Sequence, residues 1–189
     1  MAGIIENEVY KKVNYSEEAL ERGEYDNCSF SDCIFSNADL SHITFTDCEF
    51  DNCNFSMAKL NNTSLKDVKF TNCKMLGVNF SDCSTFLLSM DFSGCQLDLA
   101  SFHKLPLKKK RFRNCSMQET DFSGADLMAA VFERCDLSGA VFERTVLEKA
   151  DFRTAYNYSI DPEINKIKKA RFAIAGLPGL LGKYNIEVE

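Results

Sequence analysis

The sequence predicts an all-β repeat solenoid, a square-section β-helix in which four five-residue units complete each coil. Large apolar residues recur every five positions from Tyr25 to Phe80, and again, shifted by two, from Phe92 to Phe152. A smaller residue, mostly Cys or Ala, stands two positions before nearly every large one. A period of five matches neither the 3.6 of an amphipathic helix nor the 2.0 of an open strand, and it indicates a repeat architecture.

A second period of 20 residues sets the size of the coil. Every fourth large position is a phenylalanine, and every fourth small position is a cysteine. These core columns are Phe30, Phe50, Phe70, Phe92, Phe112, Phe132 and Phe152, with Cys33, Cys53, Cys73, Cys95, Cys115 and Cys135. Both columns stay in phase only if residues 81–91 carry a two-residue bulge. One unit is too short to bury anything alone, so the stability must come from coils stacked about 4.8 Å apart.

Residues 1–22 precede the regular repeat and are expected to form an N-terminal cap. Both ends of a solenoid expose unpaired strand edges and apolar core, so both need covering. Ile4, Ile5, Val9 and Val13 are apolar. The stretch 16–20, Ser-Glu-Glu-Ala-Leu, predicts a capped helical turn that ends at Gly23.

The repeat is expected over residues 23–157, and residues 158–189 are expected to form a C-terminal helical cap. Asp161, Pro162 and Glu163 resemble a helix start, with the helix continuing to about Lys168. The final stretch is too apolar for a free tail: it either plugs the last coil or contacts a second copy in a two-fold dimer. Its candidate dimerisation residues are Leu177, Leu180, Leu181, Tyr184 and Ile186.

The nine cysteines all obey the repeat register, so we interpret them as small inward hydrophobes with free thiols. The alternative is a zinc site, because C-x4-C pairs occur at residues 28–33 and 48–53. The register accounts for every cysteine without a metal, and we expect neither a metal nor another cofactor. No apolar run reaches the length of a membrane span or the pattern of a secretion signal, which favours a cytoplasmic protein with no membrane partner.

The repeat units themselves carry a family resemblance. Ala38-Asp39-Leu40-Ser41, the unit from Ala125 to Ala129, and the unit from Cys135 to Gly139 resemble the A(D/N)LXX motif of the pentapeptide-repeat family. The match recurs in phase over about residues 23–155. The resemblance implies that the solenoid is a right-handed quadrilateral β-helix.

Nothing in the sequence suggests catalysis. The chain has two histidines, His42 and His103, and neither lies in an H-E-x-x-H or G-x-S-x-G motif. Both follow a large inward residue, so both are expected to face solvent. A rod with convex, repetitive walls also offers no concave site where polar groups converge. We therefore expect a protein that is not an enzyme.

Charge divides the chain into two unequal halves. Residues 1–100 hold 7 Lys and Arg against 16 Asp and Glu, a net charge of −9, while residues 101–189 hold 15 against 12, a net charge of +3. The candidate acidic binding face comprises Asp32, Asp47, Glu49, Asp51, Asp67 and Asp82. These acids could attract a basic groove or simply keep the protein soluble. The basic cluster at 104–113 has no aromatic residue at its outward positions on which bases could stack, so we expect no direct binding of nucleic acid.

The family resemblance also suggests partners. Family members with a DNA-like shape bind DNA gyrase, confer quinolone resistance and dimerise through the C-terminal end. This implies an acidic DNA mimic that binds a type II topoisomerase, either DNA gyrase or topoisomerase IV. Members that protect gyrase carry large projecting loops, whereas here only the bulge at Phe86, Leu87 and Leu88 interrupts the stack. The alternative is a protein-binding scaffold whose partner contacts this bulge or the apolar tail.

Overall fold

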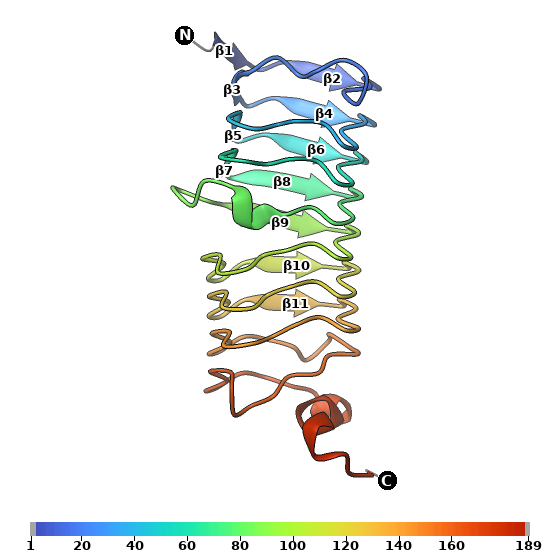
Figure 1. The fold of residues 1–189 in the computed structure, drawn as a ribbon, viewed down its shortest axis with the longest axis vertical. Helices are drawn as coiled ribbons and strands as arrows, with labels where there is room; N and C mark the ends of the chain where they lie inside the picture. The colour runs from blue at the N-terminus through green and yellow to red at the C-terminus, as the bar shows by residue number, and fades with distance from the viewer. Residues whose placement is uncertain (1–2, 188–189) are drawn as a thin grey trace.

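The computed structural model describes residues 3–187 and shows a rod of stacked coils (Figure 1). The fold class expected from the sequence, a quadrilateral β-helix with four units per coil, is confirmed. All strand pairs are parallel, and the register joins residues 20 apart, as in Phe30 with Phe50. The spacing widens to 22 residues around one coil, from Val68 with Met90 to Asn79 with Ser101.

The strands occupy two adjacent sides of the coils. One side is a four-stranded sheet in the order β1-β3-β5-β7, and the other is a seven-stranded sheet in the order β11-β10-β9-β8-β6-β4-β2. The strands are β1 (Gly3–Glu6), β2 (Val9–Lys11), β3 (Gly23–Asp26), β4 (Ser29–Ser31), β5 (Thr44–Thr46), β6 (Glu49–Asp51), β7 (Ser64–Lys66), β8 (Val68–Thr71), β9 (Met90–Ser93), β10 (Arg111–Arg113) and β11 (Val131–Glu133). The short 3₁₀ helices are η1 (Phe80–Asp82), η2 (Ile174–Leu180) and η3 (Gly182–Tyr184). Single bridges, such as Asn54 with Lys74, connect the coils on the remaining sides.

Two kinds of corner join the sides. At most corners between residues 3 and 187 the residue two positions after the large one has a positive φ, as in Asp32 (56°). On sides without strands the next N–H donates back to the carbonyl of the large residue, as Ala38 N does to Phe35 O at 3.0 Å. After β4, β6, β8, β9, β10 and β11 the described chain makes no such bond, and a cysteine occupies that position. The cysteine column therefore marks the wider corners.

The core is a ladder of aromatic rings with a column of thiols beside it. Every member of the phenylalanine and cysteine columns is at most 3% exposed. Rings of successive coils stack nearly parallel, with centroids 4.7 Å apart for Phe30 and Phe50 and 5.6 Å apart for Phe92 and Phe112. All nine cysteines are buried and free of disulfides.

The N-terminal segment differs from the separate cap expected over residues 1–22. Residues 3–22 form the first coil, because β1 pairs with β3 from Gly3 opposite Gly23 and β2 pairs with β4. Gly23 is required there, since a Cβ would lie 2.7 Å from the Gly3 carbonyl oxygen. The helical turn starts at Asn14, whose carbonyl accepts from Glu18 N at 3.3 Å, and not at Ser16. Residues 1–2 lie outside the described chain.

The prediction of a helix from near Pro162 to about Lys168 is wrong, because these residues form turns and a bridge. Asn165 occupies an inward position, where its Nδ2 donates to the carbonyl oxygens of Phe142 (2.7 Å) and Asp161 (2.9 Å), and these bonds hold a turn. The coil then continues, with Lys166 bridged to Val146 and Arg171 bridged to Asp151. The helical cap is confined to η2 and η3, and the repeat extends beyond residue 157. Residues 188–189 of the expected cap are outside the described chain.

Candidate protein-binding surfaces

Five of the six candidate acidic residues lie close together, and we call them the acidic surface: Asp32, Asp47, Glu49, Asp51 and Asp67. Glu49 and Asp51 point outward from β6. Asp47 and Asp67 occupy the corner before the seven-stranded sheet, and Asp32 occupies the corner after β4. Asp82 lies apart from them, in η1. The acidic surface therefore covers one strand-bearing side and its two flanking corners near the N-terminal end of the rod.

Within residues 3–187, four of these five carboxylates form no ion pair. Glu49 is the exception, since its Oε1 lies 2.8 Å from Lys69 Nζ. Asp32 accepts from Asn52 Nδ2 at 2.6 Å, and Asp67 accepts from Ser89 Oγ at 2.7 Å; neither donor is charged. Asp47 and Asp67 occupy equivalent positions in adjacent coils, about 4.8 Å apart. Both have a φ of 51°, a corner conformation that favours Asp and Asn over most residues, although the stacked like charges repel each other.

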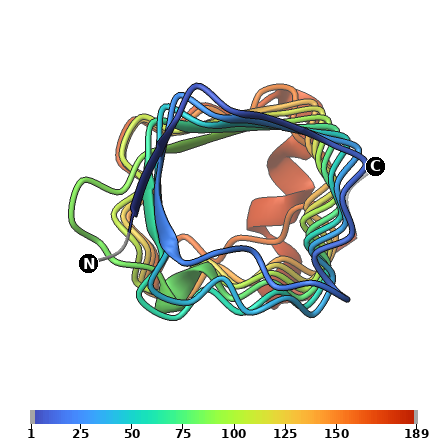
Figure 2. The same cartoon turned by 90° about the horizontal axis from the view of Figure 1, so that it is seen from above.

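The bulge, residues 84–88, projects from the side that carries the four-stranded sheet (Figures 1 and 2). It leaves the coil after Ser84, whose N–H donates to Thr63 O, and it returns at Ser89, whose N–H donates to Leu65 O. Phe86 is 70% exposed and Leu87 is 64% exposed, whereas Leu88 packs partly against the core. The four-stranded sheet ends at β7, because the bulge replaces the next strand.

Lys110 anchors the base of the bulge. Its Nζ donates to Ser89 Oγ at 2.9 Å, and this hydroxyl donates to Asp67. Others in the basic cluster form ion pairs: Lys108 Nζ lies 3.2 Å from Asp126, and Arg113 Nε lies 3.9 Å from Glu133. The cluster thus contributes partly to the structure of the rod.

The C-terminal end presents an apolar face. Leu177 is 44% exposed, Tyr184 is 52% exposed and Ile186 is 55% exposed, whereas Leu180 packs against the core. Ile174 is the most exposed large hydrophobic residue of the described chain, at 88%, and the sequence analysis missed it. The register could have indicated this exposure, because the last repeat unit ends at Phe172 and Ile174 lies beyond it. Lys183 fixes η3 through ion pairs with Asp161 (2.9 Å) and Glu163 (2.6 Å).

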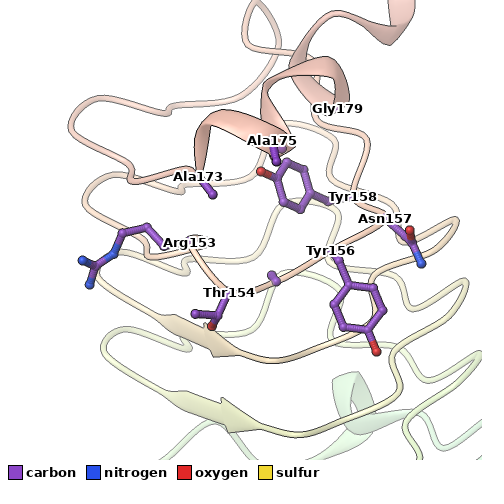
Figure 3. A pocket seen from close by; sticks show the side chains of 10 residues that line it. Arg153, Thr154, Tyr156, Asn157, Tyr158, Ala173, Ala175 and Gly179 are labelled. Carbon is purple, nitrogen blue, oxygen red and sulfur yellow. The ribbon is translucent and has the colours of Figure 1, made fainter.

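A cavity of about 410 Å³ lies beside η2 (Figure 3). It is lined by Arg153, Thr154, Ala155, Tyr156, Asn157, Tyr158, Ala173, Ala175, Gly176 and Gly179. Tyr158 is 5% exposed, and its hydroxyl has no hydrogen-bond partner among the described residues. Burial raises the pKa of Tyr158. Gly176 and Gly179 lie against this side chain and leave no room for a Cβ, so the ring fixes the path of η2.

Within residues 3–187, no group of three or more His, Cys, Asp or Glu side chains is arranged to hold a metal ion. In the same part of the chain, no helix has the length and apolarity needed to cross a membrane.

Family models match most of the chain. The model described as pentapeptide repeat region matches residues 23–102, and the model described as pentapeptide repeats (8 copies) matches residues 95–134, 107–144 and 125–156. The chain belongs to the pentapeptide-repeat family. No curated protein matches this family member in sequence.

Solved structures of other pentapeptide-repeat proteins are similar to the chain. A trypsin-treated form of QnrB1, a plasmid-mediated fluoroquinolone resistance protein, is 22% identical over 100% of this chain and 99% of its own, with a TM-score of 0.49. HetL from the cyanobacterium Nostoc, involved in heterocyst differentiation regulation, is 15% identical over 90% of this chain and 84% of its own, with a TM-score of 0.33.

Proposed function

We propose that this pentapeptide-repeat protein is a non-enzymatic binding protein whose acidic surface occupies a groove built for duplex DNA. The proposed partner is a type II topoisomerase, either DNA gyrase or topoisomerase IV. The resemblance of the repeat units to DNA-like members of the pentapeptide-repeat family suggests this class of partner. Such a partner places the protein in the cytoplasm, where nine reduced thiols persist.

The stacked pair Asp47 and Asp67 is the observation that carries this proposal. A protein that needed charge only for solubility could scatter its acids, whereas here they repeat coil over coil beside Glu49 and Asp51. A basic groove attracts such an array over a distance, which raises the association rate and makes it sensitive to salt.

Inhibition of gyrase supercoiling by the purified protein tests the proposal. The double variant Asp47→Lys with Asp67→Lys should raise the half-inhibitory concentration at least about tenfold, equivalent to about 1.4 kcal/mol. Glu119→Lys with Glu143→Lys makes the same change in net charge on other exposed positions and should have little effect. No inhibition by wild type at micromolar concentration would reject the proposal.

A second candidate function is a scaffold that binds a partner through the bulge, and the exposure of Phe86 and Leu87 favours it. A partner held by these side chains should be lost on Phe86→Ser and should stay bound at high salt. A partner held by the acidic surface should stay bound to Phe86→Ser and should be released at high salt. Pull-down with the Phe86→Ser variant and with the Asp47→Lys, Asp67→Lys variant, each at low and high salt, separates the two functions.

The apolar C-terminal face supports the further proposal of a homodimer, which would present two acidic arms. Ile174, Leu177, Tyr184 and Ile186 form the exposed part of this face. A two-fold contact between two such faces would bury them together.

A further inference from the structure

The N-terminal end of the rod has unpaired strand edges. Among residues 3–187, β1 pairs only with β3, and β2 pairs only with β4. Each of these strands therefore has one edge with no strand beside it. Edges of this kind can pair with another chain unless the protein covers them.

The coils below show which backbone groups are available at this edge. In the second coil, Ser29 N donates to Glu8 O at 2.9 Å, and Ile34 N donates to Val13 O at 2.9 Å. The equivalent residues of the first coil are Val9 and Asn14, whose N–H groups face away from the rod. If one more coil were stacked on this end, its carbonyl oxygens would accept hydrogen bonds from these two N–H groups.

A hollow of about 390 Å³ opens within this edge. Its apolar lining comes from Ile5, Tyr10, Val13, Tyr15, Leu20 and Tyr25. One face of the Tyr10 ring stacks on Phe30 at 4.7 Å, and the ring is only partly buried. Seen from above, no ribbon crosses this end, whereas η2 crosses the far end (Figure 2). The aromatic ladder thus ends in a hollow instead of a plug.

Carboxylates surround the hollow. Glu18 and Glu21 line it, and Glu8 occupies the inward column that continues as Cys28 and Cys48. None of these three glutamates has an ion-pair partner among residues 3–187. Residues 3–22 hold five Glu against Lys11, Lys12 and Arg22, a net charge of −2, so the end of the rod is apolar at its centre and negative on balance at its rim.

We propose that the N-terminal end binds an extended, basic segment of a partner protein, which adds a strand to β2. The strand would pair with the free backbone groups, place an apolar side chain over Tyr10 and direct basic side chains toward the glutamates. A second copy of this chain fits less well, because end-to-end contact would bring two rims of carboxylates together. This site is distinct from the acidic surface and the bulge, so it does not depend on the proposed function.

A blocked heptapeptide of alternating lysine and valine tests the proposal with full-length protein. Hydrogen exchange followed by NMR should show the amides of Val9 and Lys11 protected at least about tenfold by the peptide, since a paired edge exchanges slowly. A glutamate–valine peptide should give no protection. The lysine–valine peptide N-methylated on its pairing residues should also fail, because it lacks the N–H donors.

Charge reversal provides the matched test on the protein. Glu8→Lys with Glu21→Lys should weaken peptide binding at least about tenfold, whereas Glu119→Lys with Glu143→Lys should not change it. Absence of protection at Val9, equal binding of the glutamate–valine peptide, or retained binding by the Glu8 and Glu21 variant would overturn the proposal. So would an N-terminal dimer of this chain at the same site.

Discussion

The small inward position of the repeat selects for size, and where its side chain carries a donor, that donor reaches one particular carbonyl. Thr63 occupies such a position and donates its hydroxyl to Leu40 O, 23 residues earlier, at 2.9 Å. Cys53 directs its Sγ to the equivalent carbonyl, Phe30 O, at 3.4 Å. Burial raises the pKa of Cys48 to about 12, so its thiol is neutral. Thiol and hydroxyl thus make the same hydrogen bond, and seven of the nine cysteines make it.

This equivalence predicts the effects of substitutions at Cys53. Cys53→Ser should fold and keep its stability within about 1 kcal/mol, because the hydroxyl can donate to Phe30 O. Cys53→Leu should lose about 1–3 kcal/mol, since the close-packed column has no space for the added atoms. Urea unfolding followed by circular dichroism measures both, and a leucine variant as stable as wild type would contradict this account of the column.

Asp151 is expected to make stability depend on pH. Hydrogen bonds from Arg153, at 2.7 Å from Nη2 and 2.9 Å from Nε, lower the pKa of this carboxyl group. A group whose pKa is lower in the folded state stabilises the protein above its unfolded pKa, about 3.9, and this contribution is lost as the pH falls through the folded pKa. The stability difference between wild type and Asp151→Asn should therefore shrink in acid. A difference that stays constant from neutral pH to about pH 3 would contradict this role.

At the scale of the element, the sequence predicted what repeats and failed where the repeat stops. Phe30 or Cys95 could be placed from spacing alone, because each stands in a column whose neighbours impose the same environment. Asn165 could not, because its role in the final turn depends on carbonyls that only the folded coil brings within reach. The location of the acidic surface followed from the register, and the same register puts Asp82 in another column, with His42 and Asn62.

The bulge offers a test of this register. Deleting Thr85 and Phe86 restores a 20-residue coil and places Leu87 in the inward column between Leu65 and Leu107. Burying this leucine should stabilise the fold by up to about 1.5–3 kcal/mol. Deleting Phe86 and Leu87 instead leaves Thr85 in that column and should stabilise less. Thermal melts of the two deletion variants measure this difference. Equal stability of the two variants would show that the bulge is not an insertion in this column.

At the scale of the whole molecule, the walls of the rod have the same architecture along its length, whereas its two ends differ. Each coil is stabilised mainly by the coils next to it, as in other solenoids, so the terminal coils have only one such neighbour. Among residues 3–187, η2 closes the C-terminal end over Tyr158, whereas one edge of β1 and one edge of β2 have no paired strand at the N-terminal end. Interaction through the ends can therefore change without any change in the walls.

The exposed apolar face of η2 and η3 leads to a prediction about assembly. Ile174→Ser with Leu177→Ser removes two large side chains that are 88% and 44% exposed, so the folded monomer should lose little stability. If this face joins two copies, wild type should sediment as a dimer at micromolar concentration and the double variant as a monomer with an unchanged melting temperature. Ile34→Ser, at a wall position that is 40% exposed, is the matched control and should leave the dimer intact. A wild-type monomer, or a dimer that survives the double substitution, would remove the C-terminal face from consideration as the dimer contact.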